Sequence, residues 1–376
     1  MKKYGRTTVS EFLGNFIVYR NLVPLDSRLP SLSEISESLG LKPRVIPRKT
    51  TVDYARVITY LVEQACKLEN PDSQIKRIVY LGDTHLNDGT AFLNICHSGK
   101  WPGIAFIANE QKEPPNYEID EQEAGTLFLA NRWGALAEFT HFCQRREFRI
   151  DEHTAVLLDL DKTTLGARGR NDRVIDQVRL EAAAQTVGSL LGEEDDPGSF
   201  QSAYLHLNQT EFHAFTLDNQ DYLVYVCLMI GISLFDLESL VVDVKSGKMA
   251  TFDKFLANID QRKDELPVKL RSIHNDFTYR VQQGDPTPFK AFRRLEYKTT
   301  TARMGQMAAS TPVDELIAQE ITITQEVREA ALAWRDQGAL LFGISDKPDE
   351  ASIPSAKQES EGCKPIHQVE TDAVGV

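Results

Sequence analysis

Residues 155–168 read AVLLDLDKTTLGAR, an apolar run that ends in two aspartates with one residue between them. The uninterrupted run AVLL predicts a fully buried, parallel strand, because it lacks the polar alternation of a half-exposed one. In open α/β sheets the ligand crevice lies beyond the carboxyl ends of such strands, so we expect Asp159 and Asp161 to line it. Two carboxylates this close repel each other unless a cation lies between them, and Mg²⁺ accepts carboxylates together with phosphate oxygens and waters. The stretch therefore predicts an α/β fold with a magnesium site at one edge of the sheet.

Length and composition bound the class of protein. A chain of 376 residues is long enough for two or three domains, or for one core with a large insertion. The net charge of −13 argues against a general binder of nucleic acid or of anionic membranes. The five cysteines are scattered without a Cys-x-x-Cys pair, no signal peptide is recognised, and the longest apolar stretch, Tyr222 to Phe235, is too short to span a bilayer. We expect a reduced, cytoplasmic protein with no membrane or nucleic-acid partner; the oligomeric state is left open.

A second apolar run also ends in acids. Residues 77–89 read RIVYLGDTHLNDG, a predicted strand over 78–81 that is followed by Asp83 and, five residues later, by Asp88. A turn rich in Asn, Asp and Gly is the alternative interpretation of this stretch by itself. If the strand pairs beside 155–158, the carboxylates of both runs converge at the same edge of the sheet.

A third run, Leu340 to Ile344, ends in Ser345, which is read either as a helix N-cap or as part of an anion site; the two are compatible. Lys49 precedes residues 51–68, whose apolar positions recur at helical spacing. A lysine there ordinarily faces solvent. Elsewhere we expect a short strand over 103–108, a surface loop over 111–122 and only small helices over 1–48.

Taken together, these stretches resemble the haloacid dehalogenase superfamily of phosphohydrolases. DLDKT at 159–163 is similar to the family's first motif, Ser345 to its second, Lys49 to its third, and Gly82-Asp83 with Asp88 to its fourth. The order along the chain is third, fourth, first, second, so the resemblance implies a circularly permuted core. Arg48, Lys76 and Arg77 remain rivals of Lys49 for the third motif.

The resemblance implies a Rossmann-like α/β fold, Mg²⁺ as cofactor and a small phosphorylated metabolite as substrate of a phosphoric monoester hydrolase. Asp159 would be the nucleophile and Asp161 the acid and base, with Thr163 supporting their loop. Lys49 and Ser345 would stabilise the phosphoryl group. Asp83 and Asp88 would complete the metal site with Asp159 and the backbone carbonyl of Asp161.

The expected organisation is a core in two parts, residues 1–166 with the third, fourth and first motifs and residues 336–376 with the second motif and a tail, interrupted by an inserted helical cap at 167–335. Arg168, Arg170 and Arg173 lie at the start of this insertion and are candidates for binding a substrate anion, with a solvated flap as the alternative. Arg293 and Arg294 are second candidates. The competing hypothesis is a non-catalytic relative that uses its helical region to bind a partner.

Overall fold

The computed structural model describes residues 1–42, 45–192 and 197–376. Within these ranges the chain forms two compact units, one of residues 1–177 with 300–376 and one of residues 178–299. The boundaries fall within two long helices, α6 (Asp172–Leu191) and α13 (Lys290–Thr301). The larger unit contains every strand of the described chain and the smaller unit is helical.

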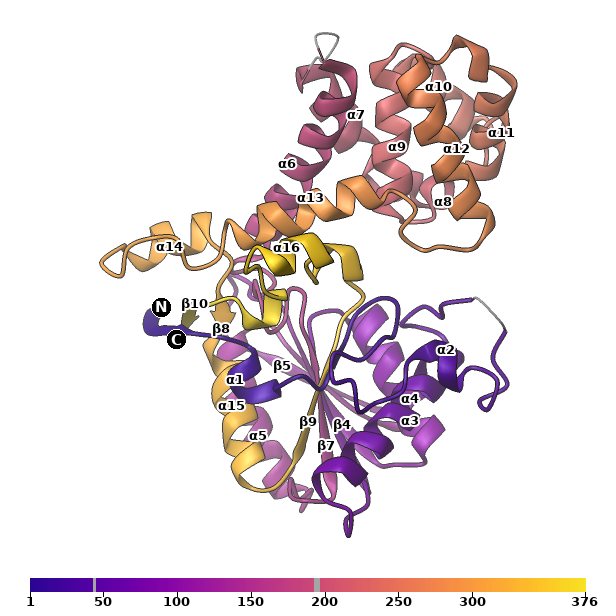
Figure 1. Cartoon of the computed structure of the whole chain (residues 1–376). Coiled ribbons are helices and arrows are strands. Elements are labelled where there is room, and N and C mark those ends of the chain that lie inside the picture. The colour runs from indigo at the N-terminus through magenta and orange to yellow at the C-terminus, as the bar shows by residue number, and fades with distance from the viewer. Residues whose placement is uncertain (43–44, 193–196) are drawn as a thin grey trace. The chain divides into compact units, whose positions relative to one another are not determined.

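A seven-stranded sheet forms the centre of the larger unit, in the order β2-β9-β7-β3-β4-β6-β5 (Figure 1). All neighbours are parallel except β5 and β6, which pair antiparallel at one edge. The four predicted strands 78–81, 103–108, 155–158 and 340–344 are confirmed. In chain order the strands are β2 (Ile17–Val18), β3 (Arg77–Gly82), β4 (Gly103–Ala108), β5 (Tyr117–Gln122), β6 (Gly125–Ala130), β7 (Thr154–Asp159) and β9 (Leu340–Ile344).

Helices cover both faces of this sheet, as expected for an open parallel sheet whose strands are buried on both sides (Figure 1). On one face α3 (Val52–Glu69) and α4 (Thr90–Gly99) pack with the inward side chains of β3, β4 and β7 in one apolar cluster. On the other, α5 (Leu136–Arg145) and α15 (Gln325–Asp336) meet through the Phe139 and Trp334 rings. The shorter helices of this unit are α1 (Ser10–Leu13), α2 (Leu32–Ile35), α14 (Val313–Gln319) and α16 (Ala356–Ser360).

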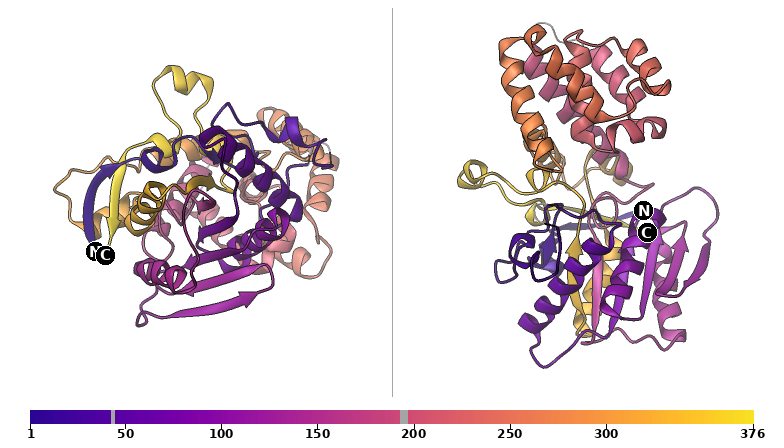
Figure 2. Two further views of the ribbon diagram at one scale, coloured as in Figure 1. Left: turned by 90° about the horizontal axis from the view of Figure 1, so that it is seen from below. Right: turned by 90° about the vertical axis from the view of Figure 1, so that its right-hand side faces the viewer.

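A second, three-stranded sheet brings the two ends of the described chain together. Its order is β1-β10-β8, from β1 (Lys2–Thr7), β10 (Thr371–Gly375) and β8 (Ile323–Thr324). β1 pairs antiparallel with β10, and the views in Figure 2 show the two termini side by side. We expected only small helices before residue 49, so β1 is a correction: its partner is about 370 residues away in the sequence, which local periodicity does not reveal.

The helical unit has its own buried core, formed mainly by aromatic and aliphatic side chains of α9 and the helices that follow it. Its helices between α6 and α13 are α7 (Pro197–Leu207), α8 (His213–Thr216), α9 (Gln220–Gly231), α10 (Leu237–Lys245), α11 (Phe252–Gln261) and α12 (Val268–Gln282). Arg293 is buried there and pairs with Asp221 and Glu296, both at 2.6 Å. This corrects the place of Arg293 as a second candidate for binding a substrate anion, since its guanidinium is satisfied inside the unit, whereas the same role for Arg294 stays a prediction.

Several expectations on organisation are refined. The fold is α/β with a mostly parallel sheet, as predicted. The compact helical unit comprises 178–299, narrower than the predicted insertion of 167–335, because α15 packs on the sheet and not among the helices. Residues 117–122, expected within a surface loop, form β5. No helix of the described residues is long and apolar enough to cross a membrane.

Candidate functional site

The pairing of β3, β7 and β9 brings three polar strand ends to one edge of the sheet. Leu81 of β3 lies opposite Leu158 of β7, and Asp159 lies opposite Ile344 of β9. Asp83 therefore follows β3, and Ser345 follows β9, on either side of Asp159. The adjacency of 78–81 and 155–158, on which convergence of the carboxylates depended, is observed.

Lys49 lies between two of these carboxylates. Its Nζ is 2.5 Å from Oδ1 of Asp159 and 2.6 Å from Oδ1 of Asp88, and all three side chains are buried. The start of α3 fixes the position of the lysine. Thr51 is the N-cap of this helix, and its hydroxyl oxygen accepts a hydrogen bond from the backbone N–H of Tyr54 at 3.3 Å. Lys49, the residue that the resemblance assigned to the third motif, thus contacts both Asp159 and Asp88. Arg77, by contrast, pairs with Asp151 at the opposite ends of the strands.

Asp88 is held by the turn that follows β3. Its Oδ2 accepts hydrogen bonds from the backbone N–H groups of Asp83 and Thr84, at 3.1 and 2.9 Å, and from the Thr84 hydroxyl at 2.7 Å. The Tyr80 hydroxyl donates to its Oδ1 at 2.9 Å. A Cβ at Gly82 would lie 2.6 Å from the Cβ of Asp88, so only glycine lets this carboxylate fold back onto the strand end.

Burial and the neighbouring charges set the protonation of this cluster. Burial lowers the pKa of Lys49, but the carboxylates of Asp159 and Asp88 outweigh it and raise that pKa well above its usual range. Burial raises the pKa of Asp159, and the carboxylates of Asp88 and Asp83 raise it further. Lys49 lowers this pKa but does not outweigh burial, so the pKa of Asp159 lies well above its usual value. Burial also disfavours ionised Asp88, yet Lys49 and the surrounding donors lower its pKa. Asp88 is therefore kept ionised, and Asp159 takes up a proton more readily than Asp88 does.

Asp83 gives the site a pH dependence. Burial, followed by repulsion from Asp88, raises the pKa of Asp83 from 3.8 to about 7, although Arg168 donates a hydrogen bond to its Oδ2 and opposes the rise. Between these two values the unfolded chain has lost this proton and the folded protein has kept it, so the contribution of Asp83 to stability falls as the pH rises. In metal-free protein, we expect the unfolding free energy of the wild type to fall relative to that of Asp83→Asn between about pH 4 and about pH 7.

Urea unfolding at a series of pH values measures this difference. Asp72→Asn, at an exposed position in the turn before β3, is the matched control and should give a difference that does not change with pH. A wild-type minus Asp83→Asn difference that stays constant or increases across the window would contradict the assignment.

Asp161 lies on the loop after β7 and not in the carboxylate cluster. Its Oδ1 is 3.7 Å from Nζ of Lys347, a buried cation that the sequence reasoning missed. The backbone N–H of Lys347 also donates to Oγ of Ser345 at 3.1 Å. The signal was available, because Lys347 follows Ser345 by two residues at the same strand end.

Thr164, the neighbour of the predicted Thr163, makes the hydrogen bonds that hold the loop after β7 to the end of that strand. Thr164 donates from both its hydroxyl and its backbone N–H to the carbonyl oxygen of Asp159, at 2.6 and 3.2 Å. Thr163 is fully buried, and its Oγ1 has no hydrogen-bond partner among the residues that the structure describes. Its carbonyl accepts from the hydroxyl of Thr324, so it anchors the loop to the segment before α15.

The three arginines of 168–173 have different environments. Arg168 reaches the site and pairs with Asp83. Arg170 is buried with Glu110 and Glu326, at 3.0 and 2.9 Å, so its guanidinium is satisfied within the core and is not placed to receive a substrate anion. Arg173 is exposed on α6. Arg170 is therefore corrected as a candidate for binding a substrate anion, whereas for Arg168 and Arg173 that role stays a prediction.

Three carboxylates fit a hard divalent cation. Asp83, Asp88 and Asp159 each offer an oxygen within 4.8 Å of the others. Oδ2 of Asp159 is buried and has no hydrogen-bond partner among the described residues, so this oxygen could accept a metal ion as its partner. An all-oxygen donor set with few protein ligands is typical of Mg²⁺.

Comparisons of the chain with models of protein families, with curated proteins and with solved structures found no match.

Proposed function

We propose that the chain is a magnesium-dependent phosphohydrolase that transfers the phosphoryl group of a small phosphomonoester to Asp159 and then to water. The observation that carries the proposal is the convergence of Asp83, Asp88 and Asp159 at the carboxyl edge of the parallel sheet, with Lys49 between Asp88 and Asp159. Buried carboxylates around one lysine cost stability, and such arrangements are concentrated at functional sites.

The arrangement of the motifs supports membership of the haloacid dehalogenase superfamily with a permuted core. The strands that end in the fourth, first and second motifs are the neighbours β3, β7 and β9, although along the chain the fourth motif precedes the first. Strands need only pair in space, and permutation is tolerated where the ends of a chain lie together, as β1 and β10 do here.

In the first step Asp159 attacks phosphorus, so that a bond from its carboxylate oxygen forms while the bond to the leaving oxygen breaks. Oδ1 of Asp159 is held by Lys49. Asp161 gives its proton to the leaving oxygen, which departs as an alcohol. Asp83, Asp88 and Asp159 would hold Mg²⁺, which would neutralise charge on the phosphoryl oxygens.

In the second step Asp161 takes a proton from water, which attacks phosphorus and frees Asp159 and inorganic phosphate. Lys49, Lys347 and the Ser345 hydroxyl provide positive charge and a donor for the phosphoryl oxygens. Lys347 is 3.7 Å from Asp161, so it would also keep that carboxyl oriented between the two steps.

Removal of the metal tests the proposal directly. We expect chelation to reduce phosphate release from an aryl phosphate by about a hundredfold or more, because a Lewis acid supplies several kcal/mol of transition-state stabilisation, and Mg²⁺ to restore it. Release is measured as inorganic phosphate, with a heat-denatured sample as blank. Turnover that resists chelation would reject the role given to the metal. No turnover with added Mg²⁺ would reject the proposal and favour the non-catalytic alternative.

A further inference from the structure

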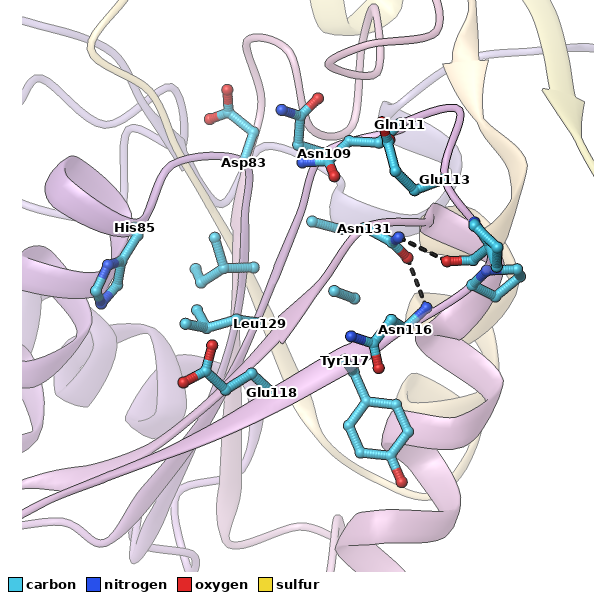
Figure 3. Close-up of a pocket in the computed structure, with 15 residues that line it drawn as sticks. Asp83, His85, Asn109, Gln111, Glu113, Asn116, Tyr117, Glu118, Leu129 and Asn131 are labelled. Carbon is cyan, nitrogen blue, oxygen red and sulfur yellow. Dashed lines mark hydrogen bonds between the residues drawn. The ribbon is translucent and has the colours of Figure 1, made fainter.

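A pocket of about 810 Å³ adjoins the carboxylate cluster, and Asp83 belongs to both (Figure 3). It lies within the larger unit, over the ends of β4 and β6 and the beginning of β5. Ile107 and Leu129 form part of its lining, and Asp83, Asn109 and Glu118 add polar groups around them. Its volume is within the range of sites that take small molecules.

Hydrogen bonds within the protein hold the loop of residues 113–116, which lines the pocket. The backbone N–H of Asn116 donates to Oδ1 of Asn131 at 2.7 Å, and Nδ2 of Asn131 donates to the carbonyl of Pro114 at 2.8 Å (Figure 3). Arg132 holds the same loop through the Glu113 carbonyl. Such a preformed loop loses little entropy when it binds a ligand.

The charged side chains that line the pocket are mainly acidic. Three carboxylates line it, from Asp83, Glu113 and Glu118, and no lysine or arginine does so among the described residues. The nearby arginines are each paired with a carboxylate: Arg132 and Arg170 with Glu110, at 3.0 Å each, and Arg168 with Asp83. His85, the one basic ring in the lining, has Asp120 at 3.8 Å. A second anionic group of a ligand would therefore meet the carboxylates of Glu113 and Glu118, while Arg168, which contacts the lining at Asp83, is already paired with that carboxylate.

The amide groups add hydrogen bonding without charge. The side chains of Asn109 and Gln111 reach the pocket, while their backbone N–H groups bond to the carbonyls of Ala130 and Asn131. Neither side-chain amide has a hydrogen-bond partner elsewhere in the part of the chain that the structure describes. Both amides can therefore accept hydrogen bonds from ammonium or hydroxyl groups.

We propose that this pocket receives the organic part of the phosphomonoester and that this part carries a protonated amine, as in a phosphorylated amino alcohol or amino sugar. The inference rests on the proposed function, because Asp83 joins the pocket to the site of phosphoryl transfer. Carboxylates favour the ammonium, and the absence of an opposing cation among the described lining residues disfavours a second phosphate or a carboxylate.

Matched substrates test this directly in the full chain with Mg²⁺. Phosphoethanolamine, ethylene glycol monophosphate and phosphoglycolate have the same length and differ in an ammonium, a hydroxyl or a carboxylate. Glucosamine 6-phosphate and glucose 6-phosphate form a larger pair. We expect kcat/KM to be at least about fivefold higher for each amine than for its hydroxyl analogue, as for one partly exposed ion pair, and lowest for the carboxylate.

Glu118→Gln should reduce the preference for the amine by about threefold, since it removes one exposed carboxylate of the lining. Glu123→Gln is the matched control: Glu123 is an exposed acid in the turn between β5 and β6 that does not line the pocket, and the preference should be unchanged. Thermal melting checks that both variants are folded.

An aryl phosphate separates failure of this inference from failure of the proposed function. If the aryl phosphate is hydrolysed but the hydroxyl or carboxylate analogues equal or exceed the amines, the pocket does not select an amine and the inference is overturned. If neither the aryl phosphate nor any of the matched esters is hydrolysed, the proposed function falls, and the inference falls with it.

Discussion

Asp159→Asn is expected to reduce Mg²⁺-dependent phosphate release by about a thousandfold or more, because an amide cannot form the covalent intermediate that divides the reaction into two easier steps. The variant should fold. The oxygen of the introduced amide can still accept a hydrogen bond from Lys49, and the change removes a buried carboxylate whose pKa burial has raised. Steady-state assays with an aryl phosphate, together with thermal melting, measure both properties.

Asp72→Asn is the matched control for this change, since Asp72 is an exposed aspartate in the turn before β3, at the ends of the strands opposite to Asp159, and its activity should equal that of the wild type. If Asp159→Asn retained a tenth or more of wild-type turnover, Asp159 could not be the nucleophile. If it lost activity only because it failed to fold, the melting curve would show this, and Asp159→Glu, which keeps the charge but displaces the oxygens, would then be compared.

Lys49→Met is expected to lower both activity and stability, and this distinguishes it from Asp159→Asn. The substitution removes the cation from between Asp159 and Asp88, which are 2.5 and 2.6 Å from its Nζ, and leaves buried charge uncompensated. Breaking a buried pair in this way costs about 3 kcal/mol or more. Urea unfolding of metal-free protein measures the loss, which should become smaller at acidic pH as the carboxylates take up protons.

Lys76→Met is the matched control, because Lys76 is an exposed rival for the same role, and its unfolding free energy should stay within about 0.5 kcal/mol of the wild type. Added Mg²⁺ should restore part of the stability of Lys49→Met, since a divalent cation bound by the carboxylates replaces part of the missing charge. Wild-type stability of Lys49→Met without metal would contradict the central place given to this lysine.

Two short stretches of sequence were enough to predict the class of fold and the ends of its central strands. AVLL at 155–158 and IVYL at 78–81 are apolar without alternation, which is the pattern of strands buried on both faces, and their parallel pairing is observed. Once such strands are parallel neighbours, the residues that follow them must share one edge of the sheet. The convergence of Asp83 and Asp159 could therefore be anticipated, because it depends on local pattern and on a general rule of topology.

Which cation meets these acids depends instead on tertiary packing. The resemblance assigns this role to Lys49 and leaves Arg48, Lys76 and Arg77 as rivals. The contact of Lys49 with Asp159 depends on how α3 docks on the sheet, across 110 residues of sequence. Tertiary packing also decides the ion pairs of Arg168 with Asp83 and of Lys347 with Asp161. It decides as well the burial of Arg170 and Arg293 and the pairing of β1 with β10. Local periodicity records which face of an element is apolar, whereas ion pairs between distant segments depend on packing that no single window of sequence contains.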